Sequence, residues 1–278
     1  MKIGVIGGSG VYDLDLMEQV ESLNIETPFG MPSSHVDHLR INGSEFYFIT
    51  RHGKGHHISP SDINYRAIIY ALKSLGVTHV ISISAVGSLK EEVAPGDFFL
   101  PDQFIDWTKG LRKRSFFENG IVGHVSVAGP IEMGLVERIK TLADKIETKF
   151  HFGGSYICIE GPQYSSRAES ELFRSFGASV IGMTNVPESY LAKEAGMAYA
   201  TVALVTDYDC WKDEACSLEE ITNVINKNVS NVKELLIHLI PSLVNDEVKF
   251  ERSNENAIVT EPSFWPKDST DIIKTLIS

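Results

Sequence analysis

Short apolar, β-rich segments alternate with amphipathic helical segments along most of the 278-residue chain. This alternation limits the fold strongly, because strands and helices in alternation form a layered α/β domain around a central sheet. We predict strands at 2–6, 44–50, 77–84, 98–105, 155–160, 179–183 and 199–206. We predict helices at 64–75, 135–145, 166–177, 187–194 and 218–240.

The C-terminal segment has a different character. We assign residues 1–243 to one domain and residues 244–278 to a tail. The tail is polar, contains Pro262 and Pro266, and closes with a short amphipathic stretch. It is expected to be either an arm that contacts a neighbouring subunit or a mobile terminus, the commoner case.

Composition excludes several classes of function. The chain has 25 Lys and Arg against 37 Asp and Glu, a net charge of -12, which argues against a nucleic-acid partner. No segment approaches the roughly 20 apolar residues of a membrane span, and the N-terminus lacks a signal peptide's apolar core. Three cysteines without close-spaced pairs argue against a disulfide framework and a structural zinc site. We expect a cytoplasmic protein.

A glycine-rich turn follows the first predicted strand, and ligands of open α/β sheets bind beyond such strand ends. In Gly7-Gly8-Ser9-Gly10, the absence of Cβ atoms lets backbone N–H groups approach an anion, and Ser9 adds a hydroxyl. A dinucleotide fingerprint fits poorly, because Asp13 stands where G-x-G-x-x-G needs its third glycine. A plain tight turn is the other alternative.

A cationic cluster follows the second predicted strand, in the segment RHGKGHH (51–57). The planar Arg51 guanidinium suits phosphate oxygens, and His52 can donate to an anion. A solvated basic loop and a metal site made by His52, His56 and His57 are alternatives. No acidic or Cys ligand lies nearby in sequence, so we expect no metal.

Two further strand ends carry hydroxyls. In the segment 82–88, the Ser84 hydroxyl and the neighbouring backbone amides can face an oxyanion, although small residues there also serve close packing. Thr184 can cap a helix or bind an anion at its N-terminus. Met183 suits an apolar contact with a sugar, but can equally fill the core.

The remaining clusters suit a planar base. Tyr164 can stack on such a base, although the capping box of Ser166 and Glu169 explains the same segment as a helix start. Asp207 and Asp209 follow an apolar strand and project the same way, so both can reach one ligand. A protonated carboxyl can donate to a leaving group, while an ionised one accepts from an amine. A Ca²⁺ or Mg²⁺ ligand pair and a solvated Asx turn are alternatives.

In this order, these segments resemble the trimeric purine nucleoside phosphorylase superfamily, and within it the 5'-methylthioadenosine phosphorylases. The resemblance runs from Gly4 to about Leu243. Its motifs are IGGSG, TPFG-x-PS, RHG, SAVGSL, EGPQYSSRAES, MTNVPE and TDYDCW. It implies a single-domain α/β phosphorylase fold, with a mixed central sheet, a distorted barrel-like core and flanking helices.

The resemblance also implies roles for individual residues. It assigns a phosphate site to Ser9, Arg51, His52, Ser84, Thr184 and the Ala85 amide. It assigns Met183 to the ribose, Tyr164 and Ser165 to the purine, Asp207 to N7 as the catalytic acid, and Asp209 to the 6-amino group. It places Leu218 and Ile221 at the 5'-methylthio group, and His124 in a neighbouring subunit's site. Tyr164 and Gln163 depart from the Phe and Arg of some relatives.

The implied activity is phosphorolysis of 5'-methylthioadenosine to adenine and 5-methylthioribose 1-phosphate. Inorganic phosphate is a co-substrate, and no metal or organic cofactor is expected. The implied assembly is a homotrimer or a dimer of trimers. A 6-oxopurine nucleoside or methylthioinosine phosphorylase is the nearest alternative. Such sites favour an amide at the base, whereas a carboxylate accepts from a 6-amino group. A hydrolase and a non-catalytic nucleotide-binding module are further alternatives.

Overall fold

The computed structural model describes residues 1–12, 17–212, 218–254 and 256–278. Within them, the strands are β1 (Ile3–Gly7), β2 (Glu18–Leu23), β3 (Val36–Ile41), β4 (Ser44–Thr50), β5 (His79–Ser88), β6 (Phe98–Leu100), β7 (Gln103–Trp107), β8 (Phe150–Phe152), β9 (Ser155–Ile159), β10 (Val180–Gly182) and β11 (Ala198–Tyr208). The α-helices are α1 (Tyr65–Ser74), α2 (Met133–Lys140), α3 (Arg167–Ser175), α4 (Asn185–Glu194), α5 (Leu218–Asn245) and α6 (Lys267–Ile277).

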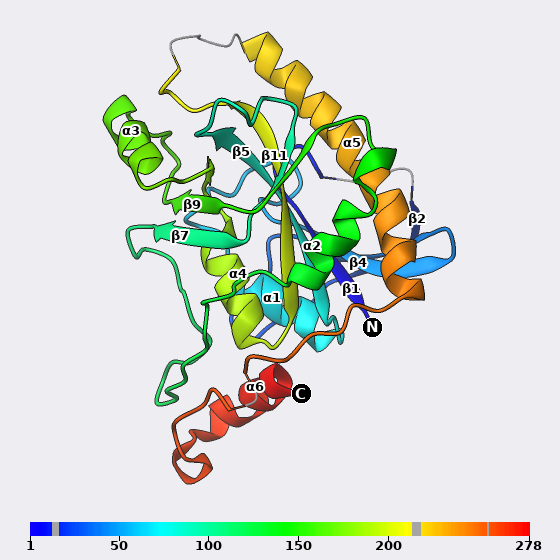
Figure 1. Cartoon of the computed structure of the whole chain (residues 1–278). Helices are drawn as coiled ribbons and strands as arrows, with labels where there is room; N and C mark the ends of the chain where they lie inside the picture. Colours follow the sequence, from blue (N-terminus) through cyan, green and yellow to red (C-terminus); the bar gives the residue numbers. More distant parts are fainter. Residues whose placement is uncertain (13–16, 213–217, 255) are drawn as a thin grey trace.

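The strands form one mixed sheet that forks at β5 (Figure 1). One path runs β2-β3-β4-β1-β5-β10-β9-β7, and the other leaves β5 through β11 to β6 and β8. β1 and β11 run parallel to β5, whereas β10 runs antiparallel to it. The predicted α/β class with a mixed central sheet is confirmed, and the fork distorts its core.

Helices cover the sheet. The long helix α5 runs along one side of the molecule and contacts α2, β11, β4 and β3, while α1 and α4 pack on each other (Figure 1). Leu235, Leu236 and Leu239 bury the inner face of α5 completely. Helix α1 begins where Asn64 accepts a hydrogen bond from the Ala67 amide at 3.1 Å, which is an N-cap.

The structure corrects several predicted boundaries. The strand predicted at 98–105 divides into β6 and β7, because Asp102 Oδ1 accepts from the Gly154 amide and a turn replaces extended backbone there. Helix α5 continues five residues beyond the predicted end, through Pro241, to Asn245. The sequence pattern did not predict β2, β3, β8 or α6.

The tail packs on its own chain. Ile273 and Leu276 of α6 are buried, and α6 contacts α1. The buried Asn254 side chain donates to the carbonyls of Glu194 and Leu276, both at 2.9 Å. Backbone hydrogen bonds also join residues 122–124 to residues 257–259. Whether the tail also meets a second subunit stays a prediction.

Candidate active site

The fork in the sheet leaves part of one edge of β5 without a strand partner. β1 pairs with β5 up to Ser82, and β10 begins its pairing at Gly87, while β11 lines the other edge throughout. The Ile83 carbonyl points into this gap, because Arg51 Nη1 donates to it at 2.8 Å. Backbone groups of alternate strand residues point the same way, so the Ala85 N–H faces the same gap.

The glycine-rich turn closes one side of the gap. A Cβ on Gly8 would lie 2.3 Å from the Ile83 carbonyl oxygen and 2.9 Å from Arg51 Nη1, so only glycine fits. This contact brings Ser9, the next residue, close to the unpaired part of β5. A Cβ on Gly10 would lie 2.8 Å from Val229 Cγ2, which places α5 against the same turn.

Arg51 lies behind the gap and is fully buried. Its guanidinium donates four hydrogen bonds. Two go to the Glu188 carboxylate, from Nε to Oε2 at 2.5 Å and from Nη2 to Oε1 at 2.9 Å. Nη2 also donates to Ser82 Oγ at 2.7 Å, and Nη1 donates to the Ile83 carbonyl. Arginine has five N–H groups, so one on Nη1 remains for a ligand. Ser82 and Tyr199 also donate to Glu188 Oε1, and thereby fix its position.

His52 is buried beside Arg51 and is neutral near pH 7. Its Nδ1 donates to the Ile58 carbonyl at 2.9 Å, since a carbonyl can only accept. Burial, and next the Arg51 charge, lower the pKa of His52 to about 4. The His56 ring stacks on the His52 ring with centroids 4.3 Å apart.

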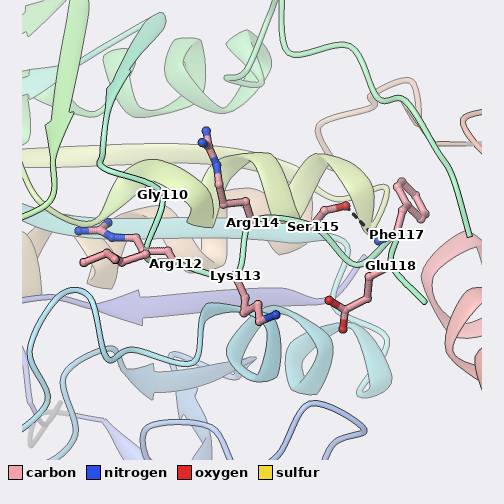
Figure 2. Close-up of a pocket in the computed structure, with 8 residues that line it drawn as sticks. Gly110, Arg112, Lys113, Arg114, Ser115, Phe117 and Glu118 are labelled. Atoms are coloured by element: carbon pink, nitrogen blue, oxygen red, sulfur yellow. Dashed lines mark hydrogen bonds between the residues drawn. The ribbon is translucent and has the colours of Figure 1, made fainter. Parts of the chain in front are cut away.

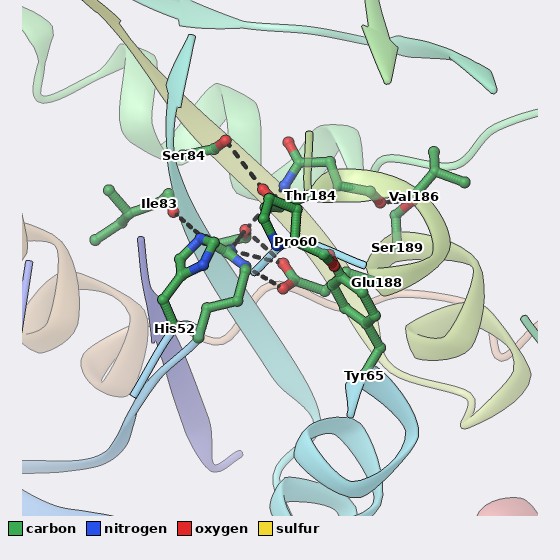
Figure 3. A network of polar contacts seen from close by, with 12 residues as sticks. His52, Pro60, Tyr65, Ile83, Ser84, Thr184, Val186, Glu188 and Ser189 are labelled. Atoms are coloured by element: carbon green, nitrogen blue, oxygen red, sulfur yellow. Dashed lines mark hydrogen bonds and ion pairs between the residues drawn. The ribbon is translucent and has the colours of Figure 1, made fainter. Parts of the chain in front are cut away.

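Two hydroxyls line the opposite side of the gap. Ser84 Oγ and Thr184 Oγ1 are 3.3 Å apart (Figure 3). The buried Tyr156 hydroxyl lies 3.2 Å from Ser84 Oγ. Thr184 precedes α4 but makes no capping hydrogen bond, so its hydroxyl is available to a ligand. The structure therefore gathers Ser9, Arg51, His52, Ser84, Ala85 and Thr184 around one gap, here called the anion cradle.

The two carboxylates lie further along the same pair of strands. β11 has an irregularity between Val205 and Asp207, and Asp207 lies opposite Gly87 of β5. A Cβ on Gly87 would be 3.5 Å from Asp209 Cβ and 3.6 Å from Asp207 Oδ2, so both side chains border one space. Burial raises the pKa of Asp207, and the charge of Asp209 adds to the effect. Burial also raises the pKa of Asp209, whose Oδ2 has no hydrogen-bond partner.

The other residues assigned to the nucleoside are less closely gathered. Met183 lies against Gly161, whose Cβ would be 2.5 Å from its sulfur. The Cys210 thiol donates to the Ser165 carbonyl at 3.2 Å. This hydrogen bond links the loop that carries Tyr164 and Ser165 to the segment that carries Asp209. Tyr164 is 85% exposed, so it lies outside the enclosed part of the site.

For three predicted residues, the assignment to the site stays a prediction. Leu218 and Ile221 lie on α5, but their side chains fall outside the described part of the structure. His124 is exposed on the long loop before α2, where its amide donates to the Ala257 carbonyl at 2.8 Å.

The sequence reasoning missed three buried residues that hold the site together. Glu188 pairs with Arg51, and Tyr156 supports Ser84. The buried Arg112 guanidinium donates to the carbonyls of Val186 and Glu160, both at 2.7 Å, and so ties together the loops that carry Thr184 and Ser165. Glu188 lies inside the MTNVPE motif, which was the available signal, whereas nothing marked Arg112.

A surface cavity elsewhere does not add chemistry. It is lined by a single loop, residues 110–118, from which the Arg114 side chain projects outward (Figure 2). Arg114 pairs with Asp106, and Glu118 pairs with Arg66, so two of the charged residues of this loop are already in ion pairs. Among the described residues, no group of three His, Cys, Asp or Glu side chains is placed to hold a metal ion. The described helices include none long and apolar enough to cross a membrane.

Comparison with known proteins places the chain in a family. The model of the "Phosphorylase superfamily" matches residues 2–241. The chain belongs to this superfamily. The resemblance found in the sequence is thereby confirmed, and the fold of this phosphorylase agrees with solved relatives. A crystal structure of a methylthioadenosine phosphorylase from an Antarctic soil metagenomic library superposes with a TM-score of 0.94 at 40% identity, covering 100% of this chain and 99% of that one.

Two curated relatives are similar over most of their length. The S-methyl-5'-thioadenosine phosphorylase of Geobacter sulfurreducens is 42% identical over 278 residues, which are 99% of this chain and 97% of the relative. That of Thermofilum pendens is 51% identical over 243 residues, 87% of this chain and 92% of the relative. A Schistosoma mansoni adenosine/methylthioadenosine phosphorylase variant, solved with methylthioadenosine, has a TM-score of 0.84 at 33% identity and covers 100% of this chain and 97% of its own.

Proposed function

We propose that this protein is an S-methyl-5'-thioadenosine phosphorylase, which converts methylthioadenosine and phosphate to adenine and 5-methylthioribose 1-phosphate. The named relatives support this substrate. One structural observation carries the proposal: the anion cradle at Ser84 and the carboxylates at Gly87 lie three residues apart along β5. That separation is about 10 Å in an extended strand. A sugar with phosphate on one face and a purine on the other fits between them.

The mechanism follows from this arrangement. The bond from the anomeric carbon to N9 lengthens first and gives the sugar oxocarbenium character. Asp207 donates its proton to N7, so the purine leaves without a negative charge. A phosphate oxygen held by the cradle then bonds to the anomeric carbon from the opposite face. Asp209, when ionised, accepts from the 6-amino group. Preorganised donors and the acid supply the charge stabilisation.

We also propose that the enzyme works in the cytoplasm, in purine and methionine salvage, as a homotrimer or a dimer of trimers, with no metal or organic cofactor. The exposed position of His124, apart from the cradle of its own chain, supports a role in a neighbouring subunit's site.

A base-release assay tests the activity. Methylthioadenosine, adenosine and inosine are each incubated with and without phosphate, and free base is measured. We expect adenine release from methylthioadenosine only with phosphate, and little release from inosine. Equal release without phosphate would indicate a hydrolase, and preferential release from inosine a 6-oxopurine phosphorylase.

A further inference from the structure

The anion cradle carries little net charge. The Arg51 cation and the Glu188 anion are both fully buried and share two hydrogen bonds, of 2.5 and 2.9 Å. Their charges therefore largely cancel at the cradle. An oxyanion must then be recognised mainly by its pattern of hydrogen bonds, because long-range attraction is weak.

His52 has an acceptor as well as a donor. Because Nδ1 donates to Ile58, the other ring nitrogen of the neutral imidazole, Nε2, carries a lone pair. Nε2 makes no hydrogen bond within the described residues. Burial, and next the charge of Arg51, favour this neutral form, and His56 acts in the same direction. The Ile58 carbonyl and Glu188 favour the charged form, but their effects are smaller in sum, so the pKa of His52 stays low.

The other groups of the cradle can donate. They are the hydroxyls of Ser9, Ser84 and Thr184, the amide of Ala85 and the remaining N–H of Arg51. A ligand that matches this set has several acceptor oxygens and one O–H group. Phosphate and arsenate keep at least one hydrogen at neutral pH, whereas sulfate keeps none.

We propose that His52 Nε2 accepts a hydrogen bond from the O–H of the bound oxyanion, and that the site thereby selects phosphate and arsenate over sulfate. With sulfate, the Nε2 lone pair faces an oxygen lone pair, and a buried acceptor stays unsatisfied. This inference rests on the proposed function, because it concerns the co-substrate of the same site.

The first test compares oxyanions in the wild-type enzyme. Adenine release from methylthioadenosine is measured with phosphate or arsenate as co-substrate, and with sulfate as a competitor of phosphate. We expect the KM for arsenate to lie within about threefold of that for phosphate. We expect the inhibition constant of sulfate to exceed the phosphate KM by tenfold or more, the scale of one unsatisfied buried acceptor.

The second test asks whether His52 is responsible. His52→Leu removes the acceptor and should raise the phosphate KM at least tenfold while changing the sulfate constant less than threefold. The ratio of the two constants should therefore approach one. His56→Asn, which suits the positive φ of 54° at residue 56 and leaves His52 in place, is the matched control and should leave the ratio unchanged. Loss of structure alone would weaken both oxyanions equally.

The outcomes separate two kinds of failure. Adenine release that needs no oxyanion overturns the proposed function and this inference with it. Phosphate-dependent release with equal affinity for sulfate overturns this inference alone, as does a His52→Leu enzyme that weakens both oxyanions to the same extent. If His52→Leu does not fold, the wild-type ratio of sulfate to phosphate still decides.

Discussion

At the scale of single residues, buried carboxyl groups differ in pKa, because their hydrogen-bond partners and neighbouring charges differ. Burial raises the pKa of Asp207, which suits a proton donor. Burial also acts on Glu160, but the Ser61 hydroxyl, Arg112 and the Lys109 amide outweigh it and lower that pKa overall. The pKa values of these two acidic residues therefore shift in opposite directions, which fits the proposed role of Asp207 as an acid and the ion pair of Glu160 with Arg112.

Replacement of Asp207 should remove the acid. We expect Asp207→Asn to lower kcat for methylthioadenosine by about 10²–10⁴-fold, because an amide cannot transfer a proton to N7. The acid form of Asp207 exists below its raised pKa, so wild-type activity should fall as pH rises through that pKa. A pH profile of kcat/KM measures this fall in activity, and the profile of Asp207→Asn should not show it. Asp271→Asn, on the exposed surface of α6, is the control; near-normal turnover by Asp207→Asn would refute its acid role.

Glu194 provides a prediction about stability. Burial raises its pKa from 4.5 to about 7, although the Phe116 amide and the Ser115 hydroxyl oppose the shift. Below pH 4.5 it is protonated in both the folded and unfolded states. Between pH 4.5 and 7 the unfolded state loses the proton first, so folding loses stability on the order of 2–3 kcal/mol. Glu194→Gln should therefore raise the melting temperature more at pH 8 than at pH 5; an equal change at both would contradict the shift.

At the scale of elements, strand positions were predictable where apolar residues dominate the strand. β1 and β4 carry apolar runs, and β4 was predicted at its observed bounds, 44–50. β2 escaped prediction because its residues are almost all exposed and its sequence, EQVESL, has little apolar content. β8 has only three residues, too few for a periodic pattern.

The residues of the candidate site also divide into those that the sequence predicted and those that it did not. Ser9, Ser84 and Thr184 stand at or shortly after the ends of predicted strands, so their positions in the sequence were enough to predict that they lie together. Glu188 lies inside the MTNVPE motif, but its partner, Arg51, lies 137 residues away, so the motif did not reveal the ion pair. Local sequence does not show which distant residue a side chain will contact.

The short strand β10 offers a prediction at this scale. A Cβ on Gly182 would lie 1.9 Å from the Tyr156 hydroxyl, which supports Ser84. Gly182→Ala should therefore displace Tyr156 and raise the phosphate KM about tenfold, the cost of a disturbed hydrogen-bond network. Gly129→Ala is the control, because a Cβ at Gly129 would meet no other atom within 4 Å. A steady-state titration with phosphate measures the effect, and an unchanged KM would show that Tyr156 does not support the cradle.

At the scale of the whole molecule, the chain leaves surface for further association. Leu111, Val259 and Phe264 are large exposed hydrophobic residues, and all belong to the long loop before α2 or to the tail. His124 lies on the same loop. These features agree with the proposed assembly, in which one chain completes the site of another.

Subunit complementation tests that assembly. We expect light scattering to give three or six times the 30.8 kDa mass of one chain. Co-expressed His124→Ala and Asp207→Asn chains should regain activity that neither variant has alone, because some mixed sites contain both native side chains. A monomer of 30.8 kDa, or no recovery in mixed oligomers, would contradict a shared site.

The missing strand partner along β5 has one more consequence. The Ala85 amide, without a neighbouring strand on its side, should exchange its hydrogen with heavy water faster than the flanking amides of the same strand. A bound oxyanion would take the place of that neighbour and slow the exchange. Deuterium uptake of a peptide spanning residue 85, followed by mass spectrometry, would then report occupancy of the cradle in the absence of any nucleoside.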